Sequence, residues 1–241
     1  MNRRIIFPVA LACLGVLTLA GCSALGSAIT GSGTVVTQAY DFTDFSEVEL
    51  GNAFEAIITP GDAYAISVTV DDNLVDSLQV EQTGNTLRIS LEPTRLVTRA
   101  TMRAEITMPA LTRLEASGAS QAQLNGFSSD ADFTGHASGA SRIHGDLVAG
   151  NLDLDASGAS TISLAGTAAD VRANASGAST IDLEEMTVVN ADVEASGASN
   201  VTVNAGGQLD AQASGASNVS YLGAPTLGSI ETSGGSNINQ R

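Results

Sequence analysis

The pentapeptide Ala-Ser-Gly-Ala-Ser occurs six times from residue 116 onward, and an altered copy, Thr-Ser-Gly-Gly-Ser, follows at 232–236. Successive copies are 18 to 21 residues apart, measured between their first serines at positions 117, 138, 157, 176, 196, 214 and 233. A near-fixed period of this length is typical of solenoids, in which each repeat forms one coil that stacks on its neighbours. The repeat therefore constrains the fold more strongly than any other feature of the sequence.

Short runs of alternating apolar and polar residues follow the pentapeptides. Four of these runs are TISL at 161–164, TIDL at 180–183, NVTV at 200–203 and NVSY at 218–221. A second alternating run, such as NLDLD at 151–155, precedes the next copy. Alternation with a period of two is the pattern of β-strands, and a coil of about 19 residues leaves no room for a helix. We therefore predict an all-β fold, a right-handed β-helix whose coils stack at about 4.8 Å.

The pentapeptides themselves are expected to form the corners of the coils. Their glycines can adopt positive φ without the penalty that a Cβ atom brings, which permits the same tight corner in every coil. These candidate structural corners are Gly118, Gly139, Gly158, Gly177, Gly197 and Gly215. The apolar residues of the strands should then form inward columns, one made of Ile162, Ile181, Val201 and Val219 and one of Leu164, Leu183, Val203 and Tyr221.

The region from 34 to 113 also reads as strands, and we expect it to continue into the same stack as the repeats at 114–241. Alternating runs indicate strands at 46–50, 54–59, 65–70, 77–82, 86–92 and 103–109. The segment 71–78 is the one plausible helical turn, with Asp71 or Asp72 as its cap. The domain is therefore expected to span 34–241.

The first 21 residues have the pattern of a secretory signal: two arginines, an apolar stretch and then small residues. The signal ends in Leu-Ala-Gly-Cys at 19–22, which resembles the lipobox of bacterial lipoproteins. That resemblance implies cleavage between Gly21 and Cys22 and lipidation of the Cys22 thiol, with residues 22–33 as the lipidated cysteine and tether. Ordinary secretion is the alternative. Cys13 leaves with the signal, so no disulfide is expected in the mature chain.

Charge narrows the range of partners. The chain has 10 basic and 26 acidic residues, and removal of the two signal arginines leaves a formal charge of −18. A nucleic-acid-binding protein needs clustered basic side chains to replace counterions, and this sequence offers none, so that class is excluded. An anionic lipid surface should be repelled as well, so the expected contact with the membrane is the lipid anchor.

A column of polar residues stands immediately before the repeats, which we call the polar ladder: Glu115, His136, Asp155, Asn174, Glu194, Gln212 and Glu231. Asp153, Asp192 and Asp210 lie two residues earlier and should share its face. The carboxylates Asp153, Asp155, Asp192, Glu194 and Asp210 are candidate Ca²⁺ ligands, because calcium prefers several hard oxygens. The alternative is a solvated acidic face, since no calcium-binding motif appears; we therefore expect no metal and no cofactor.

Catalytic signals are weak. A serine that recurs in every coil serves the architecture rather than nucleophilic catalysis, which would need a partner base. His136 and His144 are the only imidazoles, with Asp132 and Asp146 nearby in the sequence, and isolated histidines on a polar surface are usually solvated. Because no zincin, hydrolase or phosphate-loop motif is present, we interpret the protein as a non-enzyme.

The order of motifs resembles the head GIN domain family, which is named for auto-transporter adhesins of bacterial envelopes. The matching segments are GSG at 31–33, FSEVEL at 45–50, VTVDDNLVDSL at 68–78, GNTLRISLE at 84–92 and ITMPALTRLEASGAS at 106–120, followed by the recurring SGAS coils. The resemblance covers nearly the whole mature chain. It implies a β-helical fold and a cell-envelope setting, whereas the adhesin name does not by itself fix the function.

We therefore expect a lipid-anchored cell-envelope protein that acts as a binding or adhesion module for a protein or carbohydrate ligand. The alternatives are a periplasmic scaffold or stress-response component that works through protein contacts, and a polysaccharide-active β-helix enzyme. Ser23 follows the cysteine where well-studied inner-membrane lipoproteins carry Asp, which favours the outer membrane.

Overall fold

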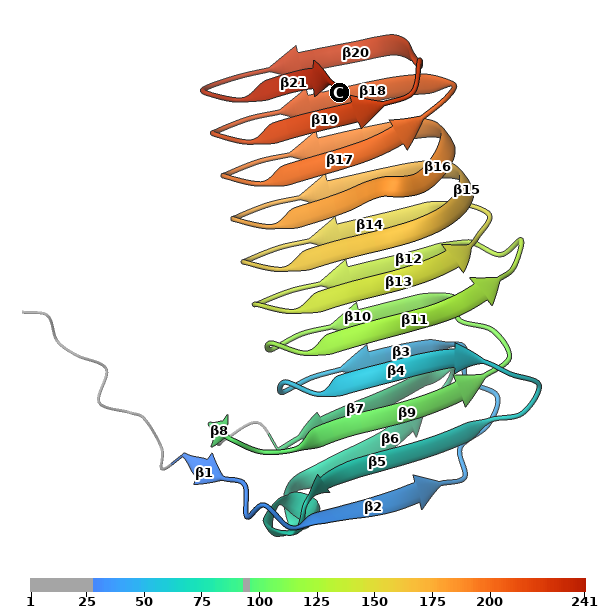
Figure 1. The fold of residues 1–241 in the computed structure, drawn as a ribbon, viewed down its shortest axis with the longest axis vertical. Helices are drawn as coiled ribbons and strands as arrows, with labels where there is room; N and C mark the ends of the chain where they lie inside the picture. The colour runs from blue at the N-terminus through green and yellow to red at the C-terminus, as the bar shows by residue number, and fades with distance from the viewer. Residues whose placement is uncertain (1–27, 93–95) are drawn as a thin grey trace, which may run out of the picture.

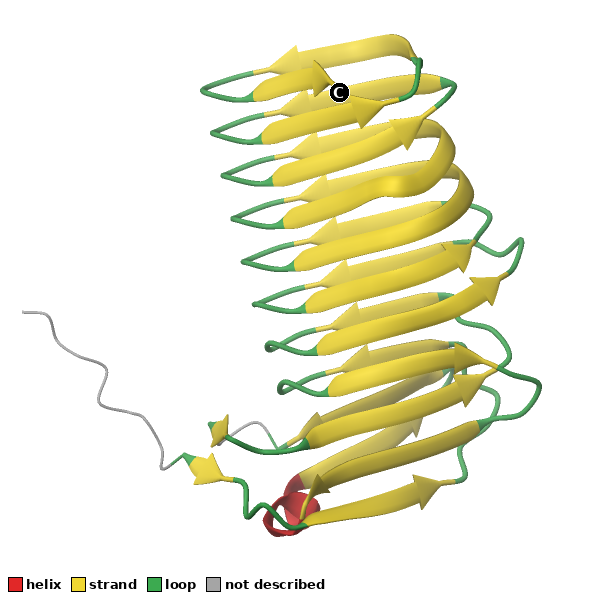
Figure 2. Ribbon diagram, in the orientation of Figure 1, coloured by secondary structure: helices red, strands yellow, loops and turns green. Residues whose placement is uncertain are grey.

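The computed structural model describes residues 28–92 and 96–241, and these form one flattened β-solenoid with two opposed sheets (Figures 1 and 2). The predicted all-β stack is confirmed, and its coils have roughly 20 residues where about 19 were predicted. Each coil contributes one strand to each of the two sheets, and the pentapeptides form the tight corners along one edge of the stack.

We call the sheet that carries the polar ladder the ladder face, and the other the opposite face. From the base upward, the ladder face contains β6 (Leu78–Thr83), β7 (Thr86–Leu91), β3 (Glu47–Leu50), β10 (Arg113–Ala116), β12 (Phe133–Ala137), β14 (Leu152–Ala156), the ends of β15 (Thr161–Ala175) and β16 (Thr180–Ala195), β18 (Gln208–Ala213) and β20 (Thr226–Thr232). The opposite face contains β2 (Val35–Tyr40), β5 (Ala65–Asp71), β9 (Met102–Met108), β4 (Glu55–Pro60), β11 (Gln121–Ser128), β13 (Arg142–Val148), the starts of β15 and β16, β17 (Asn200–Ala205), β19 (Asn218–Leu222) and β21 (Asn237–Gln240).

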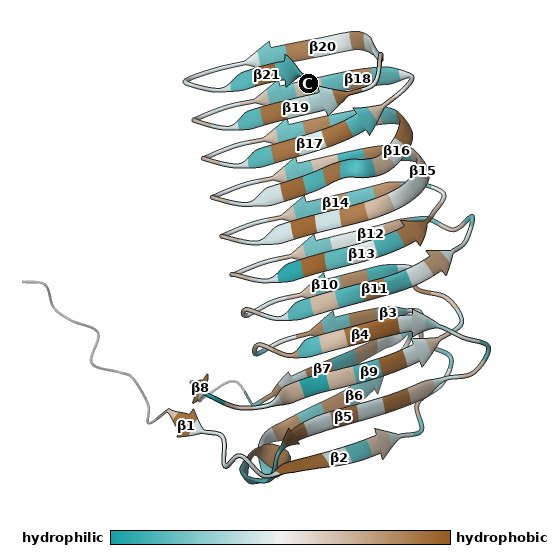
Figure 3. Cartoon of the chain, in the orientation of Figure 1, coloured by the Kyte–Doolittle hydropathy of each residue, from teal (hydrophilic) through white to brown (hydrophobic). Residues whose placement is uncertain are grey.

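Parallel pairing of equivalent strands produces columns of equivalent side chains, although some pairs contain a register shift. Ile162 lies beside Ile181, and Ile181 lies beside Val201, each one coil further along the stack. These three side chains are at most 1% exposed, as their alternation with polar residues predicts (Figure 3). In the second inward column only Tyr221 is partly exposed. Small and branched side chains therefore fill a narrow core between the two sheets.

At the base, the order of coils in space differs from their order in the sequence. β3 pairs with both β7 and β10, and β4 pairs with both β9 and β11, all in parallel. The coil of β3 and β4 is therefore inserted between a coil formed later in the chain and the first repeat coil. The chain reaches the base through β5, turns in the 3₁₀ helix η1 (Asp72–Ser77), and returns through the β6–β7 hairpin (Figure 1).

The base is closed by strands that run against the stack. β5 pairs antiparallel with β9 and with β2, and β6 pairs antiparallel with β7. Leu74 of η1 is fully buried against the core. A short pair, β1 (Ile29–Thr30) with β8 (Val97–Thr98), joins the N-terminal described residues to this end. The described tether residues thus meet the solenoid at its base.

The predicted helical turn is present, and Asp71, one of the two predicted caps, occupies its N-cap position. Asp71 precedes η1 and its side chain makes no capping hydrogen bond. Its buried carboxylate instead accepts hydrogen bonds from the backbone N–H groups of Gly33 and Thr101, each over 2.6 Å. Asp72 accepts from the hydroxyl of Ser32 over 2.5 Å. The side chain of Asp71 does not cap η1 because it instead accepts two part-buried hydrogen bonds from distant segments of the chain.

Each corner stacks directly on the corner below it. Gly177 has φ +75°, and a Cβ atom there would lie 2.7 Å from the carbonyl oxygen of Gly158. The N–H of Ala178 donates to that same oxygen over 2.7 Å. Glycine is required both for the left-handed backbone and for this close approach of two chains. All six predicted corner glycines have positive φ.

In the described residues, the only helical segment is the six-residue η1, so none of their helices is long and apolar enough to cross a membrane.

Candidate ligand-binding groove

The seven residues of the polar ladder lie in one column on the ladder face. The register pairs Glu115 with His136, and the column continues, one coil at a time, through Asp155, Asn174, Glu194, Gln212 and Glu231. From Glu115 to Gln212 each side chain points outward, because its neighbours on either side in the strand are buried; Glu231 lies in the last strand, β20, which is exposed throughout. The ladder is therefore a direct product of the repeat period.

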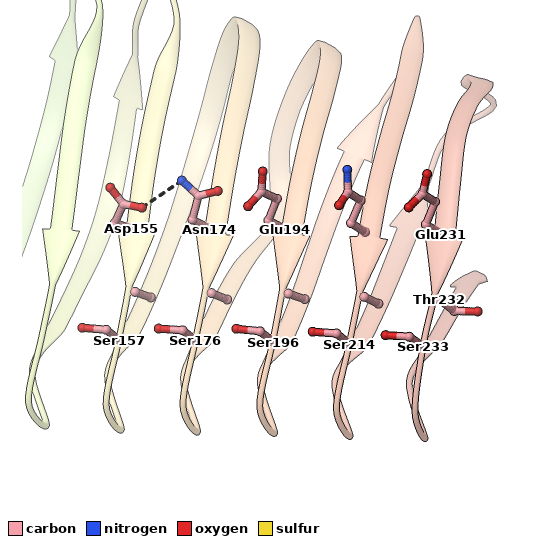
Figure 4. A pocket seen from close by; sticks show the side chains of 15 residues that line it. Asp155, Ser157, Asn174, Ser176, Glu194, Ser196, Ser214, Glu231, Thr232 and Ser233 are labelled. Atoms are coloured by element: carbon pink, nitrogen blue, oxygen red, sulfur yellow. Dashed lines mark hydrogen bonds between the residues drawn. The ribbon is translucent and has the colours of Figure 1, made fainter.

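A shallow groove of about 380 Å³ runs along the upper five members of this ladder (Figure 4). One wall is formed by Asp155, Asn174, Glu194, Gln212 and Glu231, and the other by the first serines of the pentapeptides, Ser157, Ser176, Ser196, Ser214 and Ser233. Each coil contributes one residue to each wall, with an alanine between them in four of the five coils. The groove thus presents the same polar row five times.

The two serines of each pentapeptide have different roles. The second serine is buried, and in Ser179 its Oγ donates to the carbonyl oxygens of Ser176 and of Ala156 in the preceding coil, each over 2.9 Å. The first serine faces the groove, and the Oγ atoms of those that line it donate no hydrogen bond to any described residue. Sequence reasoning treated both serines as corner residues. The sequence does contain a signal for the groove-facing role. The first serine lies two residues after the ladder position, and residues two apart in a strand point to the same face.

Hydrogen bonding along the ladder is incomplete. The Nδ2 of Asn174 donates to Oδ1 of Asp155 over 2.9 Å, and His136 Nδ1 lies 3.0 Å from the other oxygen of that carboxylate. The Oδ1 of Asn174 is shielded from solvent, accepts no hydrogen bond from the described residues, and points toward Glu194 (Figure 4). An acceptor therefore faces a carboxylate at the centre of the groove, where a ligand that donates hydrogen bonds would be favoured.

The candidate calcium ligands are not gathered into one cation site. Asp153 and Asp192 lie in one column with Arg172 between them, and Arg172 contacts Glu194 over 3.6 Å. Asp210 accepts from the side chain of Gln208 and the backbone N–H of Ser229, each over 2.6 Å. Within residues 28–92 and 96–241, no group of three or more His, Cys, Asp or Glu side chains has the geometry to hold a metal ion.

The two histidines lie on different sheets. His136 belongs to β12 on the ladder face, and His144 belongs to β13 on the opposite face. Asp132 accepts hydrogen bonds from the backbone and the side chain of Asn151, and Asp146 lies beside the glycine-lined bend of β11. The structure therefore does not bring the imidazoles together into one site. The predicted cleavage and lipidation residues, Gly21 and Cys22, lie outside the described residues.

Known structures share this architecture. A "putative adhesin" from Bacteroides fragilis is 23% identical, with a TM-score of 0.83 over 88% of this chain and 100% of that one. A "putative lipid binding protein" from Parabacteroides distasonis is 20% identical, with a TM-score of 0.69 over 89% and 100%. A "putative adhesin" from Parabacteroides merdae is 17% identical, with a TM-score of 0.65 over 90% and 100%. At these identities the likeness establishes the fold alone.

No curated protein matches the sequence. The family model described as "Putative auto-transporter adhesin, head GIN domain" matches residues 44–225, which include β3 to β19 and four of the five rows of the groove. The chain therefore belongs to the head GIN domain family, as its motif order and recurring corners predicted.

Proposed function

We propose that the protein is a lipid-anchored adhesion module of the bacterial cell envelope, which binds its ligand through the groove on the ladder face. The adhesin descriptions of the family and of related structures support the adhesion-like part of this role. The lipobox-like sequence that ends at Cys22 supports the anchor, and Ser23 supports an outer-membrane location.

The observation that carries the proposal is the position of the groove relative to the tether. The N-terminal described residues join the solenoid at the base through β1, whereas the groove occupies the five coils between Asp155 and Ser233 at the other end of the stack (Figure 1). An anchor at the base would therefore hold the groove away from the membrane. Two or three acyl chains would suffice for stable attachment, because a single chain gives only marginal binding.

A periplasmic scaffold that works through protein contacts is the competing function, and a groove held away from the membrane would suit it too. The two functions differ in which compartment the ladder face meets. The adhesion proposal requires the groove to be outside the cell, while the scaffold requires it to stay within the envelope.

The proposal is tested by attachment of cells that produce the full chain, a Cys22→Ala variant or no protein. We expect attachment to immobilised host or neighbouring-cell surfaces only with the full chain, and loss of the Cys22→Ala variant from the membrane fraction. Equal attachment of all three strains would contradict adhesion. Retention of the variant in the membrane would contradict the lipid anchor.

A further inference from the structure

We propose that the groove on the ladder face binds an uncharged polysaccharide chain that lies across successive coils. This inference rests on the proposed function and adds the class of ligand to it. It follows from the charge of the groove, from the hydrogen-bonding groups that line it, and from its fivefold repetition.

Charge excludes an anionic ligand. The lining residues include three carboxylates, Asp155, Glu194 and Glu231, and no basic side chain. Arg172, the nearest cation of the neighbouring column, already contacts Glu194. An acidic polysaccharide would therefore bring its charges against like charges, which destabilises the complex. A neutral chain has no such cost.

The lining also disfavours a peptide. The backbone of the ladder face is fully engaged in the parallel pairing of β14, β15, β16, β18 and β20, so an extended peptide cannot add a strand within the groove. The only apolar groups that line it are small alanines and the methyl group of Thr232. Protein recognition usually depends on large buried anchors such as Trp, Tyr or Arg, and the groove offers no pocket for one.

The hydrogen-bonding groups suit a polymer of hydroxyl groups. Sugar hydroxyls both donate and accept, as serine hydroxyls do. The carboxylates of Asp155, Glu194 and Glu231 accept, and the serines of the opposite wall can donate or accept. The Oδ1 of Asn174 accepts no hydrogen bond from the described residues and points toward Glu194, and a sugar hydroxyl between the two acceptors would donate its single proton to one of them.

The repetition of rows sets how affinity should depend on ligand length. Adjacent coils are about 4.8 Å apart, which is close to the advance of one sugar ring along an extended polysaccharide. Each row contributes only a few exposed hydrogen bonds, each changing affinity by roughly twofold to tenfold. Affinity should therefore rise with each added sugar until the chain fills the five rows, and then level off.

The test uses the detergent-solubilised full-length protein with soluble neutral glucans, mannans, galactans and xylans, followed by oligosaccharides of increasing length from the polymer that binds. Binding is measured by affinity electrophoresis and calorimetry at low and high salt, with and without a chelator. We expect binding to at least one polymer, unchanged by salt or chelator, and a levelling off near five sugars.

Three variants separate the groove from other surfaces. Ser196→Ala removes a central hydroxyl and should weaken binding about fivefold, whereas the matched control Ser220→Ala on the opposite face should leave it unchanged. Glu194→Gln removes a charge but keeps an acceptor, so it should change affinity by less than about threefold. All three positions are outside the core, so circular dichroism and thermal unfolding should match the parent protein.

Several outcomes would overturn the inference. These are no binding to any neutral polymer, binding of a lysine-rich peptide that is lost in high salt and in Glu194→Gln, binding that requires calcium, or release of new reducing ends, which would make the protein an enzyme. Cell attachment that persists without polysaccharide binding would refute only the ligand class. The proposed function would be refuted if the full-length protein binds the polysaccharide but is absent from the membrane fraction and does not make cells attach.

Discussion

The hydroxyl of Ser179 donates to the backbone carbonyl oxygen of Ala156, one coil below, over 2.9 Å. The same contact joins Ser160 to Ala137, Ser199 to Ala175, Ser217 to Ala195 and Ser236 to Ala213. The second serine thus adds a side-chain hydrogen bond to the backbone ladder at five consecutive corners, and it is buried at all of them except Ser236. The second serine of the repeat holds the coils together, which leaves the first serine available to the groove.

Ser179→Ala should destabilise the protein by about 1 kcal/mol, because it removes one buried hydroxyl, while the carbonyl oxygen of Ala156 keeps the backbone N–H of Ser176 as a donor. The midpoint of urea unfolding, followed by circular dichroism, measures the change. Ser176→Ala is the matched control: it deletes the groove-facing hydroxyl of the same corner and should change stability by less than about 0.5 kcal/mol. Equal losses in the two variants would contradict the division of roles between the serines.

Gly177→Ala should lower the free energy of unfolding by about 3 kcal/mol or more. Its positive φ adds roughly 1–2 kcal/mol for a residue with Cβ, and displacement of the Gly158 carbonyl oxygen adds about as much again. Gly84 of the β6–β7 hairpin also has a positive φ, but an added Cβ atom would meet nothing within 4 Å. Gly84→Ala should therefore lower the free energy of unfolding by only about 1 kcal/mol. Similar unfolding midpoints for the two variants would show that stacking of the corners contributes little.

Asp71→Ala should destabilise the base by about 2 kcal/mol, because it removes a buried carboxylate that accepts part-buried hydrogen bonds from the N–H groups of Gly33 and Thr101. Limited proteolysis should then cut near residues 31–34 before it cuts the repeat coils. Asp76→Asn, at an exposed position of the same 3₁₀ helix, is the control and should be cleaved like the parent. Unchanged protection in Asp71→Ala would mean that β1, β8 and the contacts of Asp72 and Asn73 hold the entry segment without Asp71.

Calcium should not stabilise the protein. Arg172 separates Asp153 from Asp192, and Asn174 and Gln212 separate the carboxylates of the upper polar ladder. In the described residues these carboxylates are therefore not grouped closely enough to coordinate one cation. Thermal unfolding in a calcium buffer and in a chelator should give midpoints within about 1 °C, since stabilisation by a ligand requires binding to the folded state. If calcium raises the midpoint of thermal unfolding by several degrees and Asp192→Asn abolishes that rise, the acidic face binds calcium after all.

Sequence predicted the fold well where local pattern and repeat period agree. The strands expected at 46–50, 54–59, 65–70, 77–82, 86–92 and 103–109 occur within about one residue of those bounds. The columns through Ile162 and Leu164 followed from the period of two combined with the repeat length. Both signals are local, so a single sequence contains them.

The remainder depends on contacts between distant segments. Nothing local indicates that β3 and β4 lie between β7–β9 and β10–β11, because parallel strands of similar composition can be ordered in several ways. The hydrogen bonds from Gly33 and Thr101 to Asp71 likewise depend on how two loops distant in the sequence are placed beside it. The polar ladder could be predicted from the period, but the groove could not, since it depends on the depth between long ladder side chains and short serines.

The central claim is that an anchored solenoid presents its groove outside the cell. Protease accessibility of the tagged full-length protein on intact cells tests it most directly, with Cys22→Ala and a periplasmic marker as controls. We predict digestion of the tagged protein while the marker stays intact, and release of the Cys22→Ala variant from the membrane. Protection of the full-length protein until the envelope is opened would contradict adhesion and favour a periplasmic partner.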